Sequence, residues 1–371
     1  MKKNDLALSS FRVHNFKAVQ DSEAIQFTPL TAFIGNNGSG KSSIVEALET
    51  LQILAVEGID AAMQVWHGFE YVWNRAEQHE LQKNKERPGL TNPMIFDIQG
   101  VGREGSFKAR LEITATPDLN KVFFENYYHY SDGEFTNGSK HIINDKITDP
   151  GLKAFVENWQ FIGLIPQFMT EPVPQKRSYG KIRLDKTGLN IAEYLQSIRD
   201  TDIQSFDSII ETLKVVLPYL LDLQPVITSE LERKVYLTLS EKNISGKLPG
   251  WLLSTGTLRI LCLLAVLHHP EPPSVVIIEE LENGLDPRTV HLLTDEIRYF
   301  VESGRGQVIL TTHSPYLLDL LSLSQIIVTD RDHSGSPQFI RPASKNELKE
   351  WAERFSPGKL YTMGVLTGAD G

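Results

Sequence analysis

The chain has 371 residues, 41% of them hydrophobic, which is enough for one large core or two modest ones and argues against a fibrous or disordered protein. It carries 47 acidic and 37 basic residues, and this formal charge of −10 argues against a generally basic nucleic-acid binder, although a local basic groove is compatible with it. The one cysteine, Cys262, lies in an apolar run and reads as a buried core residue. No apolar run reaches the roughly 18 residues of a membrane span, so we expect a soluble, cytoplasmic protein with no membrane partner.

The N-terminal part reads as strands followed by a helix. Residues 5–34 alternate in short apolar and polar groups, which indicates strands that lead into a glycine-rich stretch. From Lys41 the apolar residues follow helical spacing, so we expect a helix from Lys41 to about Ala55.

The middle of the chain has a different pattern. Residues 70–96 are polar and predict an exposed loop, whereas 94–101, 107–116 and 121–130 alternate as in an antiparallel meander, with 132–140 as a hairpin connection. The run 161–169 is strand-like and buried, a basic surface loop follows over 173–188, and helices are expected over 189–200 and 205–223. No cluster of acids with metal-ligand spacing is evident in this region.

The last third alternates strands and helices. Strands are expected over 235–240, 274–280, 307–314 and 324–330, and helices within 251–269 and over 287–303, with His268 and His269 at a helix end. Strands that are apolar on both faces indicate a parallel sheet covered on both sides. We therefore expect an α/β fold with an antiparallel β portion and an inserted helical lobe, divided into segments 1–60, 61–230 and 231–371.

A glycine-rich stretch between the first strands and the first helix matches the phosphate-loop pattern G-x-x-x-x-G-K-[ST] without a mismatch. Glycines let backbone N–H groups turn toward an anionic oxygen, and the helix that begins at Lys41 adds its positive end. Lys41 would reach the outer phosphates of a bound nucleotide and Ser42 would offer a hydroxyl to Mg²⁺. A plain strand-to-helix turn is the alternative. The predicted phosphate contacts are Gly35, Asn36, Asn37, Gly38, Ser39, Gly40, Lys41, Ser42 and Ser43.

Two acids end the apolar strand over 274–280. We predict that Glu279 holds the metal and that Glu280 is the base that orients and deprotonates the attacking water, because the carboxyl end of such a strand is where an open parallel sheet binds its ligand. Solvated acids after a strand are the alternative.

Two further signals are weaker taken alone. Residues 253–259, LSTGTLR, open a helix with a second anion-binding pattern that includes Ser254, Gly256 and Thr257, although an ordinary N-cap explains them as well. His313 follows the strand-like run over 307–312 and would come within reach of a γ-phosphate, although a lone histidine after a strand is usually structural.

The order of these motifs resembles that of ATP-binding-cassette ATPases. A phosphate loop, LSTGT, an acidic strand, NGLDP and TTHS occur in the same order in the soluble lineage that includes SMC proteins, RecF and OLD-type nucleases. The chain is most similar to the small AAA-family ATPases of this group, at both of its ends and hardly at all over 60–160. Two departures are Glu279, where the first acid is usually Asp, and Thr255, where transporters carry Gly.

The resemblance implies an ABC-type P-loop NTPase that forms a head-to-tail homodimer around two ATP molecules with Mg²⁺. Ser254 and Gly256 of the second copy would complete each phosphate loop, Asp286 would lie at the dimer seam, His313 would sense the γ-phosphate, and Gln167 would join Mg²⁺ to the inserted lobe. It further implies a switch in DNA repair or anti-phage defence that works with a separately encoded effector such as a nuclease.

Alternative functions are a nuclease and a transporter subunit. Asp330 and Asp332 superficially resemble a Toprim metal site, but fewer than 45 residues follow them. The glycine-poor signature and the long insertion before it disfavour a transporter. DNA is a candidate partner through the basic loop, for which a solvated surface is the commoner explanation; its cations are Lys176, Arg177, Lys181, Arg183 and Lys186.

Overall fold

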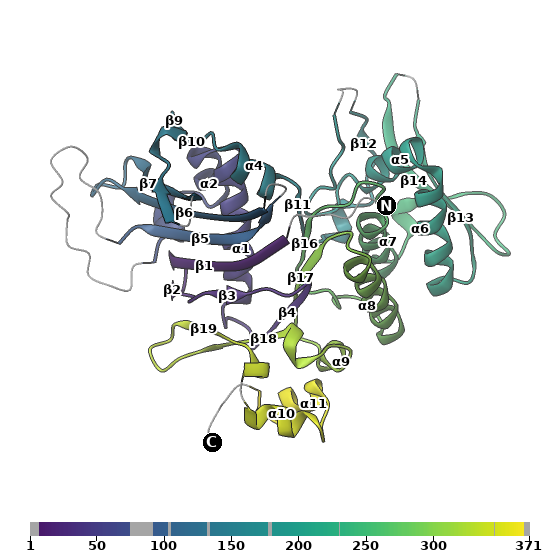
Figure 1. Ribbon diagram of the computed structural model, residues 1–371. Helices are drawn as coiled ribbons and strands as arrows, with labels where there is room; N and C mark the ends of the chain where they lie inside the picture. The colour runs from purple at the N-terminus through teal and green to yellow at the C-terminus, as the bar shows by residue number, and fades with distance from the viewer. Residues whose placement is uncertain are drawn as a thin grey trace.

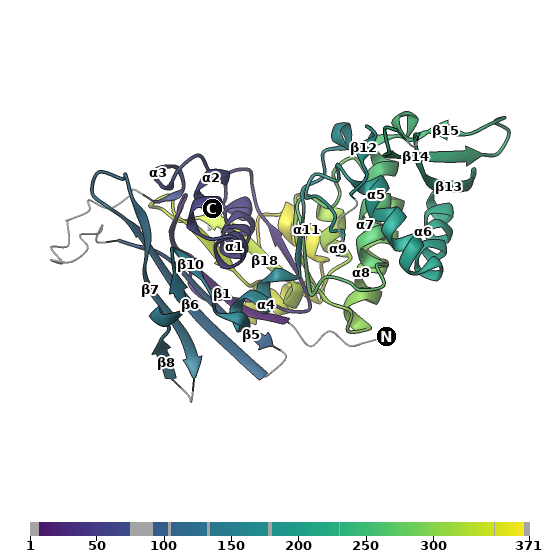
Figure 2. The ribbon, with the colours of Figure 1, turned by 90° about the horizontal axis from the view of Figure 1, so that it is seen from above.

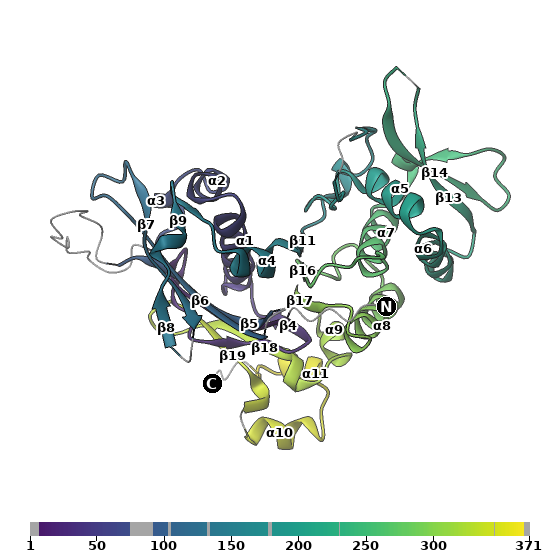
Figure 3. The same ribbon diagram turned by 45° about the horizontal axis from the view of Figure 1, so that its top comes forward.

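The computed structural model describes residues 7–74, 92–102, 105–131, 134–176, 180–229, 231–344 and 346–366. Two lobes, one mostly β and one mostly helical, flank a central parallel sheet (Figures 1 and 3). Most of the predicted exposed loop over 70–96, and Arg177 of the basic loop, lie outside the described residues.

The β lobe is built on an antiparallel sheet of seven described strands. Its order is β2-β1-β5-β6-β7-β8, and β3 pairs with β1 at Ser10 and Phe11, before the residues of β1 that pair with β2. The N-terminal strands and the predicted meander therefore share one sheet. Residues 134–137, expected within a connection, form β8 against β7. The strands are β1 (Ala7–Phe16), β2 (Val19–Asp21), β3 (Ile25–Gln26), β5 (Met94–Gly102), β6 (Gly105–Ala115), β7 (Val122–Ser131) and β8 (Glu134–Asn137).

The central sheet has the order β11-β16-β17-β4-β18-β19 and is parallel except for its last pair. Side chains of β16 alternate between two hydrophobic cores: Val275 and Ile277 face the β lobe, and Val276 and Ile278 face the helical lobe. The predicted parallel sheet, covered on both faces, is thereby confirmed. Its strands are β4 (Leu30–Ile34), β11 (Trp159–Ile162), β16 (Val275–Ile278), β17 (Gln307–Thr312), β18 (Ile326–Arg331) and β19 (Pro337–Ile340).

Helices cover the central sheet on both sides. The β lobe holds α1 (Lys41–Val56), α2 (Ile59–Val65), α3 (Phe69–Val72) and α4 (Pro150–Glu157), with the short pair β9 (Ile142–Ile143) and β10 (Lys146–Ile147). The core on the opposite face also contains residues of α5 (Ile191–Thr201), α6 (Ile203–Val216), α7 (Thr255–Leu267), α8 (Pro287–Glu302), α9 (Pro315–Asp319), α10 (Asn346–Ala352) and α11 (Pro357–Thr362).

A small antiparallel sheet lies at the far end of the helical lobe, where Figure 2 shows it beside α5 and α6. It consists of β12 (Val173–Pro174), β13 (Leu220–Ile227), β14 (Lys234–Glu241) and β15 (Leu248–Pro249). The β13–β14 pair spans the predicted segment boundary at 230, and β1 of the first segment pairs with β5 of the second.

The predicted helix over 205–223 is wrong at its C-terminal end. Helix α6 stops at Val216, and β13 begins at Leu220. Pro218 lacks the N–H that a helix requires and disfavours helical backbone at Leu217, so the apolar residues beyond it continue as a strand. Among the described residues, no helix is both long and apolar enough to cross a membrane.

Candidate active site

The predicted phosphate loop connects β4 to α1 at one edge of the central sheet. Gly38 and Gly40 have φ angles of +75° and +111°, in the left-handed region that favours glycine. Gly35 meets a steric limit instead, because a Cβ there would lie 2.0 Å from the carbonyl oxygen of Thr329. The loop therefore has a tight backbone and is followed by a 16-residue helix. This combination is typical of loops that bind anionic oxygens.

Lys41 points back over this loop. Its Nζ donates to the carbonyl oxygens of Gly35 and Asn36 at 2.8 and 3.0 Å. Burial lowers the pKa of Lys41, and the charges of Glu280 and Glu282 act in the opposite direction. The hydroxyl of Ser39 is enclosed and makes no hydrogen bond to the described residues, so the loop retains a polar group for a ligand.

The sheet register brings the predicted residues to the same edge. Ile278 of β16 lies opposite Leu310 of β17, and Thr312 of β17 lies opposite Ile34 of β4. Because these strands are parallel, the residues after them, namely Glu279, His313 and Gly35, follow at neighbouring strand ends. The phosphate loop, the acidic strand end and the histidine are thus brought together.

Glu279 forms an ion pair that the sequence did not predict. Its Oε1 lies 3.2 Å from Nζ of Lys186, which also contacts Oε2 of Glu49 on α1 at 2.7 Å. Burial raises the pKa of Glu279, and the charge of Lys186 opposes this rise. A cation therefore lies beside the carboxylate that we assigned to the metal.

Glu280 has an unusual backbone. Its φ is +49°, rare for a residue with a side chain, and its N–H donates to Oγ1 of Thr311 at 3.0 Å. Asn283 donates to its Oε2 at 3.2 Å. A strained backbone of this kind persists only where neighbouring groups hold it, as the hydroxyl of Thr311 does here. Residues with such a backbone are frequent at functional sites.

Glu282 also lies at this site, although it was not predicted from the sequence. Its Oε1 accepts a hydrogen bond of 2.6 Å from the backbone N–H of His313, and its Oε2 is enclosed without a hydrogen bond to the described residues. A third acid two positions after Glu280, in the run EELE, was the available signal. Glu282 thus links the acidic loop to the residue predicted to sense a γ-phosphate.

The β18–β19 hairpin, which was not predicted from the sequence, contacts the phosphate loop. Arg331 donates from Nε to the carbonyl oxygen of Gly38 at 2.8 Å and from Nη1 to that of Gly335 at 2.6 Å. Pro337 lies so near Gly40 that a Cβ on the glycine would approach it to 2.7 Å. The loop is therefore supported from the C-terminal part of the chain.

Ser254, Gly256 and Thr257 belong to the other lobe. Ser254 caps α7 and accepts from the N–H of Thr257 at 3.1 Å, so the N-cap interpretation is confirmed. Helix α7 packs in the core of the helical lobe, whereas α1 packs in that of the β lobe (Figure 3). Ser254 is exposed at the start of α7, so within a single chain it belongs to a different lobe from the phosphate loop.

Gly256 and Asp286 mark the same surface of the helical lobe. A Cβ on Gly256 would lie 3.0 Å from the carbonyl oxygen of Gly284, so the start of α7 adjoins the NGLDP loop. Asp286 caps α8 by accepting from the N–H groups of Arg288 and Thr289 at 3.0 and 3.2 Å. In the isolated chain Asp286 therefore has a structural role.

Gln167 lies in a single 3₁₀ turn, Pro166–Phe168, after β11. Because β11 is parallel to β16, this turn lies toward the same sheet edge as Glu279. Gln167 itself is exposed, and the residue of this connection that approaches Glu279 is Gly163, whose Cβ would lie 3.4 Å from Oε1.

The alternative nuclease residues are engaged in the hairpin. Asp332 Oδ1 accepts from the N–H groups of Ser334 and Ser336, both at 2.9 Å, and Asp330 Oδ1 accepts from the N–H of Arg331 at 2.8 Å. The group of potential metal ligands found among the described residues includes neither aspartate. These contacts favour a turn-forming role.

The described cations of the basic loop contact the protein itself. Lys181 binds the carbonyl oxygen of Glu271 at 3.0 Å, Arg183 binds that of Glu157, and Lys186 binds Glu49. Such contacts leave these three residues poorly placed to form a continuous basic surface for DNA.

The amino-acid sequence of the chain matches a known protein family. Residues 30–319 match the family described as "AAA domain, putative AbiEii toxin, Type IV TA system". Over 183 residues the chain is 23% identical to a protein of Caldanaerobacter subterraneus subsp. tengcongensis named "Putative ABC transporter ATP-binding protein", covering 47% of this chain and 74% of that one. Over 96 residues it is 25% identical to "DNA replication and repair protein RecF" of a Synechococcus species, covering 26% of this chain and 24% of that one.

Solved structures show the same fold. An Smc head bound to the C-terminal winged-helix domain of ScpA aligns with a TM-score of 0.55 at 15% identity, over 90% of this chain and 96% of that one. An Smc head with an extended coiled coil, bound to the C-terminal domain of ScpA derived from Pyrococcus furiosus, aligns with a TM-score of 0.58 at 15% identity, over 94% and 99%. The chain thus belongs to this AAA-domain family and has the fold of the Smc heads.

Proposed function

We propose that the protein binds and hydrolyses ATP, dimerises head to tail around it in the cytoplasm, and acts as a switch for a separate effector protein. The observation that carries this proposal is the division of motifs between lobes. The phosphate loop, Glu280 and His313 meet at one sheet edge, whereas Ser254 is exposed at the start of α7, a helix that packs in the core of the helical lobe.

Each residue at the sheet edge has a role in this proposal. Lys41 exchanges its contacts with Gly35 and Asn36 for phosphate oxygens of ATP. Glu280 orients the attacking water and accepts its proton. His313, tied to Glu282 through its backbone, contacts the γ-phosphate and reports its loss to the acidic loop.

The residues present fit Mg²⁺. Ser42, exposed in the first turn of α1, and the carboxylate of Glu279 offer the hard oxygen donors that this ion prefers, and the ion binds through few protein ligands when phosphates complete its shell. When bound, Mg²⁺ neutralises charge on the outer phosphates. Gln167 would extend this site toward the helical lobe.

A second copy would complete the site. The N-terminus of α7, with Ser254 and Gly256, offers backbone N–H groups for a phosphate, and the first turn of this helix holds no acidic residue. Asp286, at the adjoining NGLDP loop, would then lie at the dimer seam. ATP would bind between the lobes of two chains, and hydrolysis would release them.

The proposed partners rest only on similarity to other proteins. The Smc heads with this fold are described as bound to ScpA domains, and RecF is named for DNA replication and repair. We propose a protein effector, such as a nuclease, as the partner, in DNA repair or defence, with DNA as a further candidate. A pull-down from native cells with the ATP-bound Glu280→Gln chain, compared with Lys41→Ala, tests this.

Mixing variants tests the composite site. Lys41→Ala and Ser254→Arg should each abolish ATP hydrolysis, the first by removing a phosphate contact and the second by blocking the partner's loop. An equimolar mixture should recover part of the activity, because a mixed dimer retains one intact pair of half-sites. Light scattering should show Glu280→Gln as a dimer with ATP. A mixture as inactive as its components, or a monomeric ATP-bound Glu280→Gln, would refute the shared site.

A further inference from the structure

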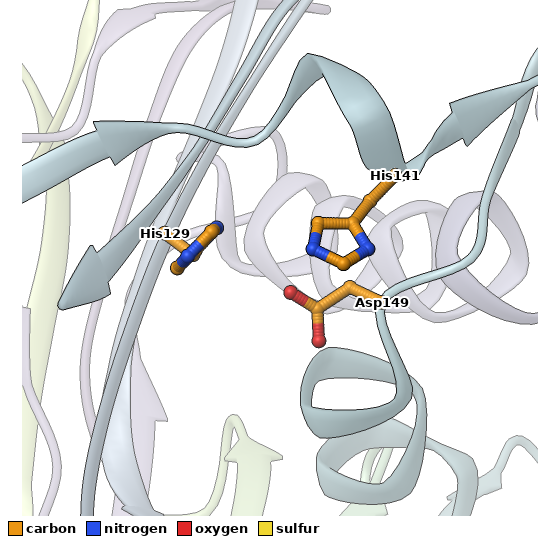
Figure 4. A group of neighbouring side chains, drawn as sticks. All are labelled: His129, His141 and Asp149. Atoms are coloured by element: carbon orange, nitrogen blue, oxygen red, sulfur yellow. The ribbon is translucent and has the colours of Figure 1, made fainter.

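A cluster of potential metal ligands lies in the β lobe, apart from the phosphate loop. His129 comes from β7, His141 ends the 3₁₀ turn Ser139–His141, and Asp149 caps α4 (Figure 4). One ring nitrogen from each histidine and one carboxylate oxygen all lie within 4.8 Å of one another. No motif spacing in the sequence predicts this meeting.

The carboxylate of Asp149 is held in position by its neighbours. Oδ1 accepts from the N–H groups of Gly151 and Leu152 at 2.7 and 3.1 Å, and Oδ2 accepts from the hydroxyl of Tyr127 at 2.8 Å. Each carboxylate oxygen has two lone pairs, so Oδ2 retains one for a further partner, already oriented as metal ligands commonly are.

His129 has a nitrogen without a partner. Its Nδ1 is enclosed and makes no hydrogen bond to the described residues, whereas its Nε2 lies 3.3 Å from Oγ1 of Thr136. That hydroxyl donates to the carbonyl oxygen of His129, so it accepts from Nε2–H. The neutral ring then carries its lone pair on Nδ1, the form in which imidazole binds a metal.

The donor set selects the class of ion. Two imidazoles and a carboxylate suit Zn²⁺ or another divalent first-row metal, whereas Mg²⁺ and Ca²⁺ favour sites made of oxygen alone. Ligand atoms about 2 Å from a tetrahedral ion lie roughly 3.3 Å apart, so the cluster must contract by about 1.5 Å at most. His141 is half-buried at the end of a single 3₁₀ turn, which leaves the ring room to approach.

We propose that His129, His141 and Asp149 bind one Zn²⁺ per chain, with a water in the fourth position. The ion would fasten β7 and the 3₁₀ turn to the start of α4. The other end of α4 is tied to α1, because Nε2 of Gln52 donates to the carbonyl oxygens of Val156 and Trp159 at 2.8 and 3.0 Å. The site would therefore stabilise the packing behind the phosphate-loop helix.

Titration of the full chain with Zn²⁺, after chelator treatment and without nucleotide, tests this site. We expect one equivalent to bind, Co²⁺ to give the visible absorption of a tetrahedral site, and Zn²⁺ to raise the melting temperature. His141→Ala should weaken Zn²⁺ binding at least tenfold and abolish the thermal shift. Asp149→Asn, which keeps a cap oxygen for α4, should weaken binding as well.

Two controls separate this site from others. His291→Ala removes a histidine whose Nε2 lies 3.5 Å from Oδ2 of Asp295 and that is not part of the group of potential metal ligands found among the described residues, and it should leave the stoichiometry at one. Lys41→Ala should do the same, because it alters only the phosphate loop. Absence of Zn²⁺ binding, or equal affinity in a folded His141→Ala chain judged by circular dichroism, would overturn the proposal.

Discussion

The ammonium group of Lys186 lies 3.2 Å from Oε1 of Glu279, the acid assigned to the metal. Burial by itself lowers the pKa of Lys186, but its hydrogen bond to Glu49 and the charges of Glu49 and Glu279 outweigh burial and raise the pKa. Lys186 therefore stays positively charged at neutral pH. Lys186 therefore acts as a local competitor for any ion that binds Glu279.

Replacement of this cation should ease metal binding. We expect Lys186→Gln to lower the Mg²⁺ concentration for half-maximal ATP hydrolysis several-fold, because a positive charge next to the carboxylate is removed. Magnesium titrations of the hydrolysis rate at pH 8 measure this. Lys181→Gln, which removes a cation of the same loop that contacts Glu271, should leave the requirement unchanged. A higher requirement in Lys186→Gln would mean that the lysine positions Glu279 instead.

Glu282 should couple His313 to the acidic loop. Glu282→Ala removes the acceptor of the His313 N–H and should reduce kcat more than tenfold with little change in ATP affinity. Glu282→Gln keeps an acceptor oxygen and should lose less. Steady-state hydrolysis and equilibrium ATP binding separate the two effects. Equal losses in both variants would show that the charge near Lys41, rather than the hydrogen bond, is what matters.

The contact between Arg331 and Gly38 should support nucleotide binding. Arg331→Ala deletes a hydrogen bond to the phosphate loop and a positive charge beside it, so we expect several-fold weaker ATP binding. Calorimetric titration with ATP measures this effect. Arg341→Ala is the matched control, because Arg341 also binds main-chain oxygens from the C-terminal region but contacts Gln26 and Ser324 instead. Equal affinity in Arg331→Ala and the natural chain would contradict the role.

His269 should make the fold sensitive to acid. Burial, with a contribution from Lys181, lowers its pKa to about 4, and its Nδ1 accepts from the N–H of Glu271 at 3.0 Å, which requires the neutral ring. Between pH 6.5 and 4 the unfolded chain binds this proton and the folded chain does not, so stability present above pH 6.5 is lost as the pH falls, by about 3 kcal/mol in total.

Urea denaturation at pH 7 and pH 5 measures this loss. His269→Gln should show a smaller difference between the two pH values than the natural chain, whereas exposed His291→Gln should show the same difference. An unchanged pH dependence in His269→Gln would assign the acid sensitivity to other groups.

The elements that could be predicted from the sequence are those that depend on residues close together in the chain. The phosphate loop, the apolar strand before Glu279 and the α7 cap at Ser254 each depend on neighbouring residues, and the structure contains all three elements. The contacts that were missed join residues far apart in the chain, such as Lys186 with Glu49, Arg331 with Gly38, and His129 with Asp149. Periodicity carries no information about which distant side chains meet. The end of α6 before Pro218 is different, because the effect of a proline on a helix is local and could have been predicted from the sequence.

The alternation of β16 between two cores has a consequence for the acids that follow it. A slip of this strand by one residue would move Val275 and Ile277 into the core built for Val276 and Ile278, and the same slip would displace Glu279 and Glu280 along the sheet edge. Apolar packing on both faces therefore fixes the position of charged groups that neither core contains. Selection for a well-packed interior is, at this strand, also selection for the placement of the acids.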